Sequence, residues 1–256
     1  HHGFSVEFAE HREYLPGDDL RYVDWKVYGK SDRIYLKQYE EETNFACHLL
    51  LDVSDSMRYR APALPERPAA VLSKLQYAVS LAAAIGYLVT RQQDAVGLMT
   101  FGESIEGHLA PSSRGSHLGE LFRRLEATGP GRVLSFDETP GGESETEAEG
   151  IIERVLVEAS QRMRRRGLVI VLSDLFDDPA SLLRGFKRLK HGRHDVRVLQ
   201  VIDRAEEQFP FDDPTHFRGL EHSGERRIEP RALQQAYCEE FTRFLKSVQA
   251  GVRGMG

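Results

Sequence analysis

Three oxygen-bearing side chains stand at every second position directly after a run of apolar residues. The run Leu49-Leu50-Leu51 leads into Asp52, and Ser54 and Ser56 follow, which gives the pattern Asp-x-Ser-x-Ser. Alternate residues of an extended chain project to the same side, so we expect these three oxygens to lie together past a strand end. Such ligands suit a small hard cation such as Mg²⁺. The alternative is a strand followed by an ordinary Asp/Ser turn.

A second apolar run, over residues 168–172, also ends in an acid, within Ser173-Asp174. Apolar strands and helical patterns alternate along most of the chain, which is typical of right-handed crossovers and a mostly parallel, doubly wound α/β sheet. Ligands bind such sheets at the carboxyl ends of the strands. Asp52 and Asp174 both follow a strand, so we expect these two distant acids to meet at one edge.

Hydrophobic periodicity predicts the elements that position these residues. We expect strands over residues 33–41, 45–53, 94–101, 168–172 and 196–202, an antiparallel partner over 104–110 and a hairpin over 215–228. We expect helices over residues 69–92, 116–127, 146–165, 179–190 and 231–249. The first 32 residues are polar and rich in turn-forming types.

Composition narrows the class of protein. The 256 residues are 40% hydrophobic, which allows one substantial core, and the net charge of −6 argues against a nucleic-acid surface. The two cysteines, Cys47 and Cys238, are too few and too far apart for a disulfide framework or a metal cluster, so we expect a cytoplasmic protein. We expect neither a membrane span nor a signal peptide.

The unit of strand, Asp-x-Ser-x-Ser and helix resembles the von Willebrand factor A-type domain, whose sheet is Rossmann-like. In that domain a metal-ion-dependent adhesion site joins this motif to a distant threonine and a distant aspartate. The resemblance places this threonine in the loop before the helix that precedes the strand of Asp174. Thr146 is the first choice for it, and Ser144 is the second. The resemblance implies five metal ligands: Asp52, Ser54, Ser56, Thr146 and Asp174.

The amino-terminal segment is more specific. Residues 3–21 read Gly-Phe-Ser-Val-Glu-Phe-Ala-Glu-His-Arg-Glu-Tyr-Leu-Pro-Gly-Asp-Asp-Leu-Arg, and Asp24-Trp25-Lys26 follow. With residues 217–221, this signature resembles the DUF58 family, a bacterial group often encoded beside MoxR-type AAA+ ATPases. The resemblance implies an arm over residues 1–41, packed on a von Willebrand A-like domain over residues 42–256. Family members usually continue past such an end, so we interpret the chain as trimmed after Gly256.

The ligand types indicate what such a site does. A cation held by neutral hydroxyls and two carboxylates keeps positive character and an open position, which a partner's Glu or Asp can fill. We therefore expect a non-enzymatic protein–protein interaction module that uses Mg²⁺, or else Mn²⁺ or Ca²⁺. The family resemblance alone adds a MoxR-type AAA+ ATPase as the partner and complex assembly as the task.

Two other interpretations of the motif stay open. In the first, the chain is a structural scaffold whose metal site is degenerate and empty. In the second, Asp52 is the nucleophile of a Mg²⁺-dependent phosphotransferase. Such enzymes of the haloacid dehalogenase type place a second aspartate two residues later as the general acid, and Ser54 stands there instead.

Other motifs give weaker signals. Gly29-Lys30-Ser31 is no P-loop, because Asp24 stands where a glycine is required. His191 and His194 are spaced for zinc, but their basic neighbours indicate a surface turn. Trp25 is interpreted as a core anchor.

Overall fold

The computed structural model describes residues 6–15, 18, 23–31, 33–41, 46–61, 72–128, 150–163, 165–211, 215–218, 225–228 and 230–254. The chain divides into two compact units, residues 1–44 and residues 45–256. This division falls close to the boundary expected after residue 41, and the packing of the first unit on the second stays a prediction.

The first unit holds more regular structure than its polar sequence indicates. Strands β1 (Val6–Glu13) and β2 (Tyr35–Glu41) pair antiparallel, and helix α1 (Trp25–Ser31) lies between them in sequence. Asp24 begins the helix, because its Oδ1 accepts the backbone N–H groups of Lys26 and Val27 at 3.0 and 3.3 Å. Trp25 is 63% exposed and meets Tyr28 edge to face, so within this unit it is not the core anchor expected.

The second unit is built on a sheet with the strand order β5-β4-β3-β6-β7. All neighbours in it are parallel except β5, which runs antiparallel to β4. The mostly parallel α/β sheet expected from the sequence is confirmed. Its strands are β3 (Ala46–Asp52), β4 (Ala95–Phe101), β5 (Ile105–Ser112), β6 (Leu168–Ser173) and β7 (Asp195–Gln200).

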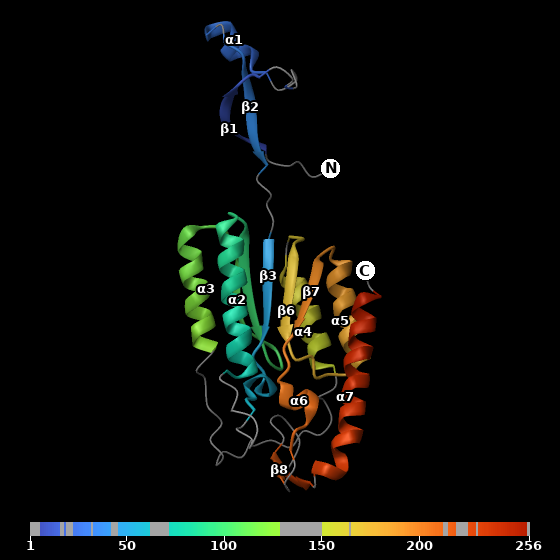
Figure 1. Cartoon of the computed structure of the whole chain (residues 1–256). Helices are drawn as coiled ribbons and strands as arrows, with labels where there is room; N and C mark the ends of the chain where they lie inside the picture. The colour runs from blue at the N-terminus through green and yellow to red at the C-terminus, as the bar shows by residue number, and fades with distance from the viewer. Residues whose placement is uncertain are drawn as a thin grey trace. The chain divides into compact units, whose positions relative to one another are not determined.

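Helices cover both faces of this sheet (Figure 1). All seven residues of β3 are buried, and its side chains alternate between the two faces. Leu49 and Leu51 pack in one apolar cluster with α2 and α3, and Leu50 packs in another with α4, α5 and α7. The helices are α2 (Lys74–Arg91), α3 (Gly115–Thr128), α4 (Ile151–Arg162), α5 (Pro179–His191), α6 (Arg204–Gln208) and α7 (Pro230–Arg253).

The start of α2 differs from the sequence prediction. The helix begins at Lys74, later than the expected residue 69, because Ser73 and Gln76 form a capping box. The Ser73 Oγ accepts the Gln76 backbone N–H at 3.2 Å, and the Gln76 Oε1 accepts the Ser73 N–H at 2.9 Å. In contrast, α5 begins at Pro179, the residue expected, and Asp178 caps it. The late hairpin is present as β8 (Thr215–Arg218) and β9 (Glu225–Ile228). Among the described helices, none is both long and apolar enough to cross a membrane.

Two histidines are buried near the amino ends of the strands. His48 on β3 and His194 before β7 are 4% and 5% exposed, with ring centroids 6.1 Å apart. The expected surface turn at His194 is therefore wrong. Within the described residues, His48 Nε2 and His194 Nδ1 have no hydrogen-bond partner. Burial, assisted by the nearby His194 and His108, lowers the pKa of His48 from 6.5 to about 4.

We predict that His48 makes the protein sensitive to acid. The unfolded chain binds a proton near pH 6.5 and the folded chain only near pH 4, so the free energy of unfolding falls between these values, by on the order of 3 kcal/mol at most. In denaturant titrations at pH 7.5 and 4.5, His48→Gln should lose less stability than the wild type. The exposed His191→Gln should match the wild type, and an equal loss in His48→Gln would contradict the assignment.

Candidate metal centre

Strands β3 and β6 bring the two acid-bearing segments together. They are parallel neighbours in which Leu51 pairs with Leu172, so their carboxyl ends, Asp52 and Ser173, lie side by side. The Ser173 Oγ donates a hydrogen bond to Asp52 Oδ2 at 2.5 Å. Asp174 follows at the next position. The topology thus places both predicted acids at one edge of the sheet.

The Asp-x-Ser-x-Ser oxygens gather only in part as expected. The Val53 N–H still donates to Phe101 O at 2.7 Å, and the chain enters a 3₁₀ turn, η2 (Asp55–Arg58), only after Ser54. The Ser54 backbone N–H and Oγ donate to Asp52 Oδ1 at 3.0 and 2.6 Å. The Oγ atoms of Ser54 and Ser56 are 3.2 Å apart. Near-extended backbone therefore brings Ser54 to Asp52, and the turn brings Ser56 to Ser54.

Hydrogen bonds and an ion pair fix the position of Asp174. Its carboxylate accepts the Phe176 backbone N–H at 3.2 Å and the Lys74 ammonium at 2.8 Å. Gln200 Nε2 donates to its backbone oxygen at 3.0 Å. The next residue, Leu175, has a φ of 61°, a left-handed conformation that costs energy outside glycine. Such a turn persists because these contacts fix it, and it keeps Asp174 buried at the strand end.

Lys74 and Glu206 complete the charged cluster, and our sequence reasoning missed both. The Lys74 side chain is 2% exposed, and its Nζ lies 2.8 Å from Asp174 Oδ2 and 2.6 Å from Glu206 Oε1. The same ammonium lies 4.8 Å from the centroid of the Phe176 ring. The sequence feature that could have pointed to Lys74 is its position immediately before the apolar residues of α2. Ser173 was also missed, although it adjoins Asp174 in the sequence.

Asp52 is a buried carboxylate without a cationic partner among the described residues. Its hydrogen-bond donors are the Ser54 and Ser173 hydroxyls and the Ser54 backbone N–H. Burial, followed by the nearby Asp174, raises the pKa of Asp52 from 3.8 to about 6, against the opposing effect of these hydrogen bonds. Such a carboxylate gains free energy from any cation that reaches it.

The donor set fits a hard divalent cation. Among the described residues no three His, Cys, Asp or Glu side chains are placed to hold a metal ion, so a metal here would need the serine hydroxyls as ligands. Asp52, Ser54 and Ser56 supply one carboxylate and two hydroxyls, and the Ser54 hydroxyl lies within hydrogen-bonding distance of the other two. Thr146 and Ser144, the candidates for the distant hydroxyl, lie outside the described residues.

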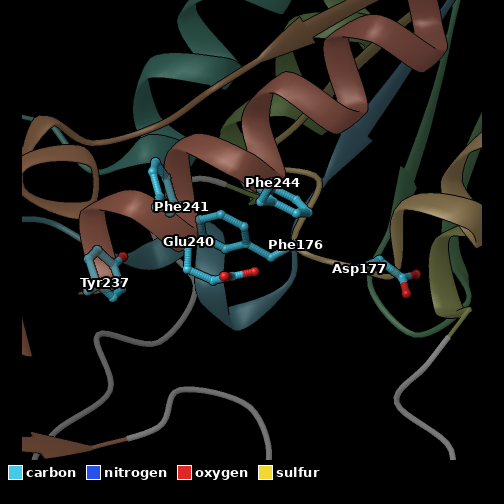
Figure 2. Close-up of a pocket in the computed structure, with 6 residues that line it drawn as sticks. All are labelled: Phe176, Asp177, Tyr237, Glu240, Phe241 and Phe244. Carbon is cyan, nitrogen blue, oxygen red and sulfur yellow. The ribbon is translucent and has the colours of Figure 1, made fainter. Parts of the chain in front are cut away.

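An apolar pocket of about 330 Å³ adjoins this edge of the sheet. Figure 2 shows it between the turn after Asp174 and α7. It is lined by Phe176, Asp177, Tyr237, Glu240, Phe241 and Phe244. Phe176 lies next to both the Lys74 ammonium and the pocket. Phe176 is thus shared by the pocket and the charged cluster.

The fold and the site define a mixed α/β domain with an Asp-x-Ser-x-Ser loop at the carboxyl edge of its sheet. The model of the family described as "Protein of unknown function DUF58" matches residues 10–246, and the chain belongs to this family. The family expected from the amino-terminal signature is thereby confirmed.

Individual relatives are distant. Uncharacterized proteins of Mycobacterium tuberculosis and Mycobacterium bovis are 25% identical over 99% of this chain and 73% of their own length. Among solved structures, BatB from Bacteroides thetaiotaomicron is 18% identical with a TM-score of 0.46, covering 80% of this chain and 87% of BatB. An aerotolerance-related membrane protein from Bacteroides fragilis is 17% identical with a TM-score of 0.45, covering 82% and 96%.

We predict that Asp52→Asn stabilises the metal-free protein at neutral pH. Because the folded pKa of Asp52 lies above its ordinary 3.8, the carboxylate costs stability as the pH rises from about 4 to about 6. In the presence of a chelator, the free energy of unfolding at pH 7.5 should increase by up to about 3 kcal/mol, with no gain at pH 3.5. A loss of stability at pH 7.5 would mean that the Asp52 charge is already compensated.

Proposed function

We propose that this chain is a non-enzymatic module that binds another protein through a divalent cation. Mg²⁺ is the first choice of ion, with Mn²⁺ or Ca²⁺ as alternatives. The proposed ligands are Asp52, Ser54, Ser56, Thr146 and Asp174. The observation that carries the proposal is the buried Asp52 carboxylate, surrounded by hydroxyls and, among the described residues, by no cationic group.

The ligand types favour binding over chemistry. Serine hydroxyls are neutral, so a cation beside them keeps much of its charge and attracts a carboxylate from outside. A partner's Glu or Asp would complete the coordination, and removing that carboxylate would leave a desolvated cation short of a ligand, at a cost of a few kcal/mol. The specificity of the contact would then depend on one acidic residue of the partner.

The proposed partner is a MoxR-type AAA+ ATPase, and its support is the family resemblance alone. A role in assembling or maturing protein complexes follows from that resemblance. A cytoplasmic location and the absence of nucleic acid among the partners stay predictions from composition.

The local contacts of Asp52 argue against phosphoryl transfer. Ser54 stands where a second aspartate would act as the general acid, and its Oγ donates to Asp52 Oδ1. A hydroxyl in this position is a poor acid for a leaving group at neutral pH. Hydrolysis of p-nitrophenyl phosphate that is lost in Asp52→Asn would favour the enzyme instead.

One observation favours the scaffold alternative. The Lys74 ammonium already pairs with Asp174, so one of the two proposed acidic ligands has an internal counter-ion. A chain that never binds metal would use this ion pair to stabilise the sheet edge. Metal titration separates this alternative from the proposed module.

We predict that the metal-free protein binds Mg²⁺ and Mn²⁺ through Asp52. Calorimetric titration should give a one-site isotherm for the wild type and no heat for Asp52→Ala. Asp55→Ala is the matched control, because Asp55 is adjacent and acidic but half exposed and paired with Arg58 at 3.3 Å. It should bind metal as the wild type does. Equal heats from Asp52→Ala and the wild type would contradict the assignment.

We predict that the bound cation links this chain to its ATPase partner. A purified MoxR-type ATPase should co-elute with the wild type in Mg²⁺ and separate from it in EDTA, because the cation bridges the two proteins. Asp52→Ala should fail to co-elute in either buffer, and Asp55→Ala should behave as the wild type. Complex formation that survives EDTA would contradict a metal-bridged contact.

A further inference from the structure

Lys74 stands where the helix itself disfavours a positive charge. It is the first residue of the 18-residue helix α2, and the amino end of a helix carries a partial positive charge that favours anions. The side chain is nevertheless 2% exposed. Neither solvation nor the helix dipole accounts for an ammonium there. The carboxylates of Asp174 and Glu206, at 2.8 and 2.6 Å, supply the compensation.

The ammonium also joins segments that are distant in sequence. Asp174 follows β6, and Glu206 belongs to α6, where it forms a capping box with Asp203. Asp203 in turn accepts the backbone N–H of Ala61 at 3.3 Å, in the chain that follows the Asp-x-Ser-x-Ser loop. The Lys74 backbone N–H donates to Tyr59 O at 3.1 Å in the same stretch. One buried charge therefore lies at the junction of the loop, α2, β6 and α6.

The charge of Lys74 affects how strongly the cluster attracts a divalent cation. When ionised, the carboxylates of Asp52, Asp174 and Glu206 with the ammonium of Lys74 carry a formal charge of −2, which one divalent cation neutralises. Without Lys74 the same cluster would carry −3. A positive charge inside the cluster stabilises it without metal and repels an entering cation.

We propose that Lys74 is an internal counter-cation that stabilises the metal-free site and lowers its affinity for a divalent cation. This inference rests on the proposed function, because Asp174, whose carboxylate pairs with Lys74, is one of the proposed metal ligands. The site then holds its metal weakly in the free protein. A partner's carboxylate, by adding a ligand, would tighten it.

Lys74→Met and Glu206→Gln test the proposal because they change the cluster's charge in opposite directions. Mn²⁺ alone is the probe, with free Mn²⁺ measured by electron paramagnetic resonance and the metal-free melting temperature measured in parallel. Lys74→Met should melt at a lower temperature yet bind Mn²⁺ about tenfold more tightly, and Glu206→Gln should bind it about tenfold more weakly. The exposed Lys187→Met is the matched control and should change neither quantity.

The outcomes separate this inference from the proposed function. If the wild type binds Mn²⁺ and Lys74→Met binds it equally or more weakly, the inference is wrong and the metal site stands. If only Lys74→Met binds Mn²⁺, the inference holds and the wild-type metal site fails. If neither binds, both fail. Should Lys74→Met not fold, unchanged Mn²⁺ affinity in Glu206→Gln overturns the inference.

Discussion

A carboxylate buried at the end of a central strand is the constraint on which this site depends. Asp52 is 3% exposed, and its hydrogen-bond donors in the described chain are all neutral. Transferring a carboxylate from water into such a place is costly unless a cation or strong hydrogen bonds compensate it. The Ser54 and Ser173 hydroxyls compensate in part, but burial and the nearby Asp174 still raise the pKa of Asp52. The site is therefore prepared to accept positive charge.

The neighbouring acid, Asp174, differs from Asp52 in having a cationic partner. Asp174 is equally buried, but it pairs with Lys74, which also pairs with Glu206. The sheet edge thus combines Asp174, whose carboxylate has a cationic partner, with Asp52, whose carboxylate has only neutral donors among the described residues. This asymmetry supports both of our proposals: the uncompensated Asp52 favours a cation, and the internal ammonium limits how tightly that cation is held.

Much of the architecture could be predicted from the sequence because its signals are local. The apolar run before Asp52, the alternation of strands and helices and the start of a helix at residue 179 each depend on residues close in the chain. The first unit was harder to predict, since β1 and α1 are short elements in a polar segment.

The site was only partly predictable, because its remaining members depend on tertiary contacts. Asp52 could be linked to Asp174 from the sequence, because parallel strands end at the same edge of a sheet. No local rule, however, predicts the 3₁₀ turn that begins at Asp55. The role of Lys74 could not be inferred while α2 was expected to begin at residue 69, since that start places it inside the helix instead of at its first position. Glu206 joins the cluster only through the packing of α6.

A crystal structure of the protein grown with Mn²⁺, with anomalous data collected at the manganese edge, would test the central claim most directly. We expect one anomalous peak within coordination distance of oxygens of Asp52, Ser54 and Ser56, at the edge of the sheet where Asp174 also lies. Saturating Mn²⁺ with no peak at these oxygens, and the Lys74–Asp174 ion pair unchanged, would contradict it.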